Sequence, residues 1–135
     1  MTDLSKYTSL RVGGPAKKII QVSNEAEIIA AIEQAGDSPV LILGGGTNLL
    51  VSDKGFDGTV IRISNNSVKS EVDACSGATL TIGAGEDWDT FVQTTIDRGY
   101  AGLETLSGIP GTVGAAPIQN IGAYGHEVAE FITRV

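Results

Sequence analysis

Cysteine, histidine and basic side chains are all scarce in this chain of 135 residues. The single cysteine, Cys75, excludes an intrachain disulfide and a cysteine-rich zinc site, and with no histidine near it in the sequence we interpret it as an ordinary turn thiol. The single histidine, His126, lies outside any His, Asp or Ser cluster, so it is a poor candidate for a general acid. The net charge of −7 disfavours nucleic acid and anionic membranes as partners.

A long apolar run is also lacking. The first seven residues contain no apolar signal core, and the uncharged run from Thr105 to Gly125 is too rich in Gly, Pro, Gln and Asn to span a bilayer. We therefore expect a reduced, cytoplasmic protein with no membrane insertion and no metal site. A hydrophobic content of 41% is enough for one modest core or for two small subdomains.

The pattern of apolar residues predicts an α+β fold in two subdomains. In residues 1–65 we expect strands at 17–22, 39–43 and 58–63 and a helix at 23–35, with Ser23 or Asn24 as its cap. The buried face of that helix is predicted to hold Ala26, Ile28, Ile29 and Ile32. In residues 66–135 we expect strands at 67–73 and 78–82 and a helix at 85–98 that Gly99 ends.

A glycine-rich turn, Gly44–Asn48, follows the strand 39–43, which we predict to be buried because its residues after Pro39 are all apolar. Successive backbone N–H groups in such a turn can hold a pyrophosphate without a basic side chain, and no Lys or Arg lies between Pro39 and Ser52. The turn lacks the Gly-Lys-Ser/Thr of a phosphate-binding P-loop, and Leu49 stands where a nicotinamide-type fingerprint needs a third small residue. The turn alone is also compatible with having no ligand.

A second unusual loop runs from Gly108 to Gly125. It contains five glycines and two prolines and no charged side chain, a composition that makes neither an ordinary helix nor a central strand. Gln119 and Asn120 add amide donors and acceptors to an otherwise apolar segment. Such a surface suits a flat, largely uncharged ring with polar edges.

Four segments together resemble the UDP-N-acetylenolpyruvoylglucosamine reductases, also called UDP-N-acetylmuramate dehydrogenases: Thr8–Pro15, Pro39–Asn48, Gly83–Trp88 and Gly102–Gly125. The resemblance implies the two-subdomain FAD-binding fold of the vanillyl-alcohol-oxidase type. It also implies FAD as cofactor, NADPH as hydride donor, and reduction of an enolpyruvyl ether on a UDP-sugar during peptidoglycan (cell wall) synthesis.

The resemblance also implies roles for residues of both loops. The first subdomain would bind the pyrophosphate, and the second would bind the flavin ring, with Trp88 as scaffold. Tyr124 would border the substrate side of the flavin or pack against its own loop. The implied cofactor-binding residues are Gly44, Gly45, Gly46, Thr47, Asn48, Leu49, Pro110, Gly111, Gly114, Ala115, Ala116, Gln119, Asn120 and Gly122.

No catalytic residue is predicted. The serine, arginine and glutamate that the family uses have no counterpart in the matching segments, so we expect a chain truncated at its C-terminus that lacks the substrate-binding domain and is inactive alone. Two other functions stay open. An FAD-dependent sugar or alcohol oxidase would share Gly44–Asn48 but has no reason to carry Pro117–Gly125, and a non-catalytic nucleotide-binding module would bind no flavin.

Overall fold

The computed structural model describes residues 2–73 and 77–135 and divides the chain into two compact units, Met1–Asn65 and Asn66–Val135. Cys75, interpreted above as a turn thiol, lies outside the described residues.

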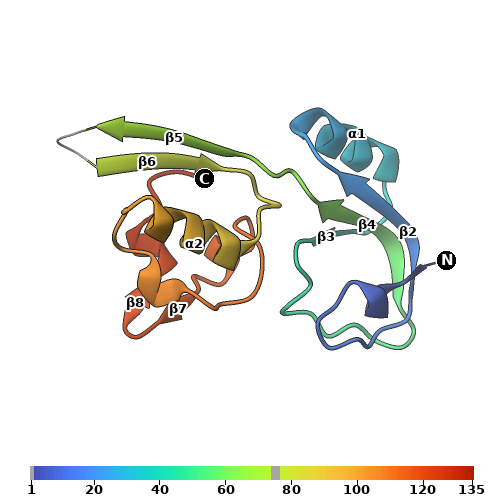
Figure 1. Ribbon diagram of the computed structural model, residues 1–135. Coiled ribbons are helices and arrows are strands. Elements are labelled where there is room, and N and C mark those ends of the chain that lie inside the picture. Colours follow the sequence, from blue (N-terminus) through green and yellow to red (C-terminus); the bar gives the residue numbers. More distant parts are fainter. Residues whose placement is uncertain (1, 74–76) are drawn as a thin grey trace. The chain divides into compact units, whose positions relative to one another are not determined.

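The first unit is a four-stranded sheet with one helix (Figure 1). The strand order is β1 (Thr2–Asp3), β2 (Pro15–Val22), β4 (Phe56–Ile63) and β3 (Val40–Leu43). β1 is antiparallel to β2, whereas β2 and β3 both run parallel to β4. The helix α1 (Glu25–Ala35) connects β2 to β3 and contacts β2 and β4, and a short 3₁₀ helix, η1 (Leu4–Lys6), follows β1. The carboxyl ends of β3 and β4 therefore point the same way.

Hydrogen bonds among Ser23, Asn24 and Glu27 stabilise the start of α1. The Asn24 side-chain oxygen accepts a hydrogen bond from the Glu27 backbone amide at 2.9 Å. The Glu27 carboxylate accepts from the Ser23 backbone amide at 2.7 Å and from the Ser23 hydroxyl at 2.9 Å. These bonds, the Ser23 amide first, lower the pKa of Glu27. Asn24 is the N-cap, and Gly36 ends the helix with φ 53°.

The predicted buried face of α1 was wrong in three of its four residues. Ala31 and Ala35 are buried and Ile28 is half-buried, whereas Ala26 is exposed and Ile29 and Ile32 keep about half of their surface exposed. The apolar residues surround more of this helix than one small sheet can cover, so periodicity alone did not select the right stripe.

The two faces of the sheet carry different cores. On one side Ile61 and Val22 pack with Ala31 of α1, and on the other Val60, Leu43, Leu4 and Ala16 form a second cluster. β3 is the edge strand, and α1 lies over β2 and β4. Val40 and Ile42 of β3 consequently remain 41% and 52% exposed, although the sequence predicted a buried strand.

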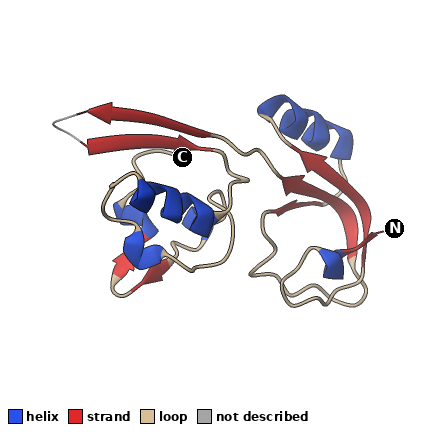
Figure 2. Ribbon diagram, in the orientation of Figure 1, coloured by secondary structure: helices blue, strands red, loops and turns tan. Residues whose placement is uncertain are grey.

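The second unit combines a hairpin with one helix and several short elements (Figure 2). The hairpin pairs β5 (Val68–Asp73) with β6 (Gly77–Ile82), and α2 spans Trp88–Asp97. The short elements are η2 (Glu104–Leu106), η3 (Ala116–Ile118), β7 (Gly122–Ala123), β8 (His126–Glu127) and η4 (Val128–Glu130).

The core of this unit forms around α2. Trp88 is 3% exposed, and its indole N–H donates to the Leu106 carbonyl at 2.9 Å. Phe91 meets the Trp88 ring edge-on at 5.9 Å. At the other end, the Gly99 and Tyr100 amides donate to Ile96 and Thr95 at 2.9 Å each, which is a Schellman ending. Trp88 is thus a core residue that joins α2 to the following loop. None of the described helices is long and apolar enough to cross a membrane.

Candidate functional site

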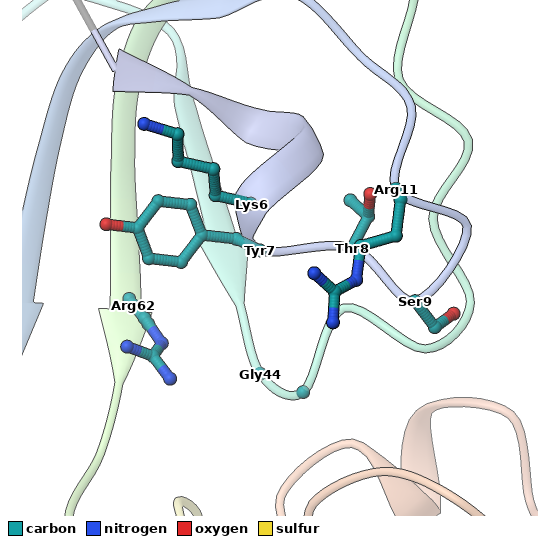
Figure 3. Close-up of a pocket in the computed structure, with 8 residues that line it drawn as sticks. Lys6, Tyr7, Thr8, Ser9, Arg11, Gly44 and Arg62 are labelled. Atoms are coloured by element: carbon teal, nitrogen blue, oxygen red, sulfur yellow. The ribbon is translucent and has the colours of Figure 1, made fainter.

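A polar pocket of about 280 Å³ lies in the first unit, between the glycine turn and the segment after η1 (Figure 3). Cationic, hydroxyl-bearing and glycine residues line it, and neither a carboxylate nor an aliphatic side chain is among them. The lining residues are Lys6, Tyr7, Thr8, Ser9, Arg11, Gly44, Gly45 and Arg62.

Two loops form this pocket by direct backbone contact. The Ser9 amide donates to the Gly46 carbonyl at 3.0 Å, and the Ser9 hydroxyl donates to the Thr47 carbonyl at 3.4 Å. Gly46 has φ +65°, and a Cβ at this position would lie 1.9 Å from the Tyr7 carbonyl oxygen. Only glycine lets the turn approach the Tyr7 backbone so closely.

Arg62 is oriented by two neighbours. Its guanidinium donates to the Gln21 side-chain oxygen at 3.2 Å and lies 5.3 Å from the centre of the Tyr7 ring. In the sheet, Arg62 is the register partner of Leu43, the last residue of β3. The parallel pairing of β3 and β4 therefore brings Arg62 to the start of the glycine turn.

Arg11 adopts an unusual backbone conformation. Its φ is +56°, in the left-handed region that costs a non-glycine residue about 1–3 kcal/mol. The turn is anchored by buried Thr8, whose hydroxyl donates to the Val12 carbonyl at 3.0 Å and whose carbonyl accepts from the Arg11 amide at 3.1 Å. Figure 3 shows the Arg11 side chain turned back toward the Gly44 turn.

The three cations of the pocket are not neutralised by the protein. The ion pairs of the described chain are Lys17–Asp57 and His126–Glu130, neither of which involves Lys6, Arg11 or Arg62. Among the backbone hydrogen bonds of the described turns and loops, none uses the Gly45 or Gly46 amide as its donor. The pocket is thus a local positive site in a chain of net charge −7.

The residues predicted in the first loop separate into different environments. Gly44 and Gly45 line the pocket, whereas Gly46 is buried against Tyr7. Asn48 is exposed, and the side chain of Leu49 packs against the core cluster that contains Leu4 and Val60. Thr47 is half-buried.

Sequence reasoning missed the three cations because it looked for basic residues only within the turn itself. Two signals could have found two of them: the Thr8–Pro15 motif contains Arg11, and a parallel pairing of the predicted strands would bring Arg62 to the end of β3. No signal in the sequence pointed to Lys6.

The loop Gly108–Gly125 in the second unit is tied to α2 at its start. The Asp89 carboxylate accepts from the Gly108 amide at 2.6 Å and from the Ser107 hydroxyl at 2.9 Å. These bonds, the Gly108 amide first, lower the pKa of Asp89 below its usual value of 3.8. Further along, the Gly114 amide donates to the Ala84 carbonyl at 2.9 Å, and a Cβ on Gly114 would lie 2.5 Å from the Ala84 side chain. Gly114 is therefore needed for packing.

The end of the loop is braced by Asn120. Its amide N–H donates to the Glu127 carboxylate at 2.6 Å, its oxygen accepts from the Ala129 amide at 3.0 Å, and its φ is +47°. Both ends of this side chain are thus engaged within its own unit. Of the other residues predicted to contact a ring, Ala116 is buried in the core, Gly111, Gly114 and Ala115 are half-buried, and Pro110, Gln119 and Gly122 are exposed.

Tyr124 stands at the tip between β7 and β8. It is 89% exposed with φ +54°, so it does not pack against its loop, which was one of its two predicted roles. The neighbouring His126 is half-exposed and lies 3.2 Å from the Glu130 carboxylate. No group of three potential metal ligands occurs among the described residues.

Comparison with known proteins finds UDP-N-acetylenolpyruvoylglucosamine reductases among the similar proteins. The chain is 48% identical over 134 residues to UDP-N-acetylenolpyruvoylglucosamine reductase of Cutibacterium acnes, covering 98% of this chain and 36% of the relative. The Streptomyces coelicolor reductase is 46% identical, with coverage of 98% and 34%. The chain thus spans about a third of the length of these relatives.

A solved structure agrees with these relatives. The crystal structure of UDP-N-acetylenolpyruvylglucosamine reductase from Thermus caldophilus matches with a TM-score of 0.74 and 33% identity, over 95% of this chain and 44% of that one. A family model described as an FAD binding domain matches residues 16–135. The family model and the solved structure confirm the predicted FAD-binding fold and the predicted cofactor, FAD. Because that match covers most of the sequence, the chain belongs to the FAD binding domain family.

Proposed function

We propose that this chain is the FAD-binding portion of a UDP-N-acetylenolpyruvoylglucosamine reductase. The enzyme would use NADPH to reduce UDP-N-acetylglucosamine enolpyruvate to UDP-N-acetylmuramate in the cytoplasm, for cell wall synthesis. The observation that carries the proposal is the identity of 46–48% across 98% of the chain to proteins of that name.

The pocket of the first unit fits the diphosphate of FAD. An anionic group needs donors and no competing carboxylate, and the pocket supplies hydroxyl groups, Gly44 and Gly45 backbone and cations. We assign Gly44–Asn48 to the diphosphate. Gly46 serves this site by holding the turn against Tyr7, and Leu49 serves it by anchoring the turn in the core.

The loop of the second unit is assigned to the flavin ring. The residues that would hold the ring are Pro110, Gly111, Gly114, Ala115, Ala116, Gln119, Asn120 and Gly122. Bonds from Asp89 and Asn120 brace the loop before any ligand binds, which reduces the ordering cost of binding. Asn120 retains one amide hydrogen beyond its bond to Glu127 for a polar ring edge.

When bound, FAD supplies the hydride-transfer chemistry, and the residues of this chain orient the ring and exclude water. We assign Tyr124, whose side chain is exposed, to the substrate side of the flavin. We assign no proton donor in this chain, and we expect the 135-residue chain with FAD to show no NADPH oxidation dependent on the UDP-sugar.

A chimera tests the proposed function. The matching 134 residues of the Cutibacterium acnes reductase are replaced by this chain, and FAD content and NADPH oxidation with UDP-N-acetylglucosamine enolpyruvate are measured. We expect FAD retention and turnover that depends on the UDP-sugar. A matched chimera with Gly45→Asp, which adds a carboxylate to the pocket, should lose both. A folded, FAD-loaded chimera that leaves NADPH unoxidised in the presence of the UDP-sugar would contradict the proposal.

A further inference from the structure

Five of the eight residues that line the pocket in the first unit lie outside the FAD binding domain match. That match begins at residue 16, whereas Lys6 and Arg11 precede it. We propose that Arg11 and Arg62, supported by Lys6, are diphosphate-binding residues that complete the site formed by the Gly44 turn. The assignment of FAD as the ligand rests on the proposed function. The prediction that this pocket binds a diphosphate rests on its lining residues alone.

The backbone of Arg11 is the first observation. A turn whose only task was to reverse the chain would favour glycine at a φ of +56°, and Gly13 occurs two residues later. An arginine held there by buried Thr8 points to a role for its side chain, since strained conformations of this kind gather at ligand sites.

The second observation is the orientation of Arg62. Its bond to Gln21 uses one of the five guanidinium N–H groups, and stacking on Tyr7 restricts its rotation. The remaining N–H groups offer the planar fork that binds two phosphate oxygens at once. Because Arg62 is half-buried and has no carboxylate partner among the described ion pairs, an anion would gain strongly from it.

Size and polarity define the ligand class. A volume of about 280 Å³ lies just below the ~300–1,000 Å³ of pockets that enclose whole small ligands, so this pocket suits a group of a larger molecule. Three cations and no aliphatic side chain favour a doubly charged diphosphate over an apolar ring. FAD carries its diphosphate as a doubly charged diester, whereas ADP and UDP carry a terminal diphosphate with a third ionisable oxygen, and a titration can distinguish the three.

The test is a calorimetric titration of the 135-residue chain with FAD, ADP, UDP and riboflavin, which has no phosphate. Arg11→Gln and Arg62→Gln should each weaken FAD and ADP about 10- to 100-fold, the range of a charged hydrogen bond, and leave riboflavin unchanged. Lys18→Gln removes the same charge from an exposed position of β2 outside the pocket and should change nothing.

Two further variants separate binding from folding. Arg11→Gly removes the charge but relieves the left-handed backbone, so its melting temperature should equal or exceed that of the parent while FAD affinity falls. Arg62→Lys retains the charge without the fork and should recover part of the affinity lost in Arg62→Gln.

The outcomes distinguish the two proposals. Tight FAD binding that is equal in the parent, Arg11→Gln and Arg62→Gln overturns the diphosphate role and leaves the proposed function standing. Binding of ADP and UDP as tight as that of FAD, with both arginine variants impaired, supports the diphosphate site but contradicts the FAD assignment. Failure of the parent chain to bind FAD, ADP or UDP overturns both.

Discussion

Replacing Gly46 by alanine should destabilise the first unit far more than the same change at a glycine with open space around it. Gly46 has φ +65°, and a new Cβ would lie 1.9 Å from the Tyr7 carbonyl oxygen and 3.2 Å from the Thr8 Cα. Both neighbours are backbone atoms, so no side-chain rotation relieves the contact. The turn or the segment after η1 has to move, and with it the Ser9 bond to Gly46.

The magnitude follows from two terms. A non-glycine residue at this φ costs about 1–3 kcal/mol, and forcing an extra methyl group into a packed site costs about 1–3 kcal/mol more. Gly36→Ala is the matched control in the same unit, because Gly36 also has positive φ, 53°, but nothing lies within 4 Å of its added Cβ. The difference between the two variants should thus be about 1–3 kcal/mol, out of a total stability of about 5–15 kcal/mol.

Urea unfolding followed by circular dichroism measures this difference. Tryptophan fluorescence is unsuitable, because the only tryptophan of the chain, Trp88, lies in the second unit. If Gly46→Ala and Gly36→Ala lower the free energy of unfolding equally, the contact between the glycine turn and Tyr7 is not required. The description of the pocket as two loops held together would then be wrong.

Three substitutions test individual hydrogen bonds of the second unit. Asp89→Asn should destabilise the second unit at pH 7. Because the pKa of Asp89 is lowered by the Gly108 amide, its stabilisation is complete above pH 3.8 and is lost as the pH falls through the lower pKa, so parent and variant should converge in acid unfolding curves. Trp88→Phe leaves the buried Leu106 carbonyl unpaired and should cost about 1–3 kcal/mol in thermal unfolding. Asn120→Ala should increase hydrogen exchange at Ala129 and lower FAD affinity.

For each of these substitutions, one result would contradict the role given to its hydrogen bond. A pH-independent difference for Asp89→Asn would mean that the carboxylate does not bind the loop, and an unchanged melting temperature for Trp88→Phe would mean that its bond to Leu106 is dispensable. Unchanged FAD affinity in Asn120→Ala would limit that side chain to bracing its own unit through Glu127 and Ala129.

Local signals were sufficient for much of the secondary structure. Asn24 and Gly36 delimit α1 because caps and left-handed glycines act within a few residues, and the same holds for Gly99 after α2. The buried stripe of α1 and the exposure of Ile42 were wrongly predicted. Both depend on how much of the sheet the helix covers, and a short stretch of sequence does not determine that coverage.

The candidate site was only half visible in the sequence. The glycine turn can be recognised from its composition, but Arg11 and Arg62 are 51 residues apart and only the fold brings both to it. Arg62 reaches the turn because β3 and β4 pair in parallel, with Leu43 opposite Arg62, and the segment that holds Arg11 reaches it through the bond from Ser9 to Gly46. The ligand-binding role predicted for Gly46 stays a prediction, and the structure adds a packing role that only its contact with Tyr7 reveals.

A visible-absorbance titration of the purified 135-residue protein measures whether the chain binds FAD, on which the assignments of both loops depend. We expect saturable binding with about one FAD per chain and a displaced visible spectrum of the flavin. Gly45→Asp should cause a large loss of affinity, because it introduces a carboxylate among the cations of the pocket. A flavin spectrum that stays identical to that of free FAD at excess folded protein would contradict it.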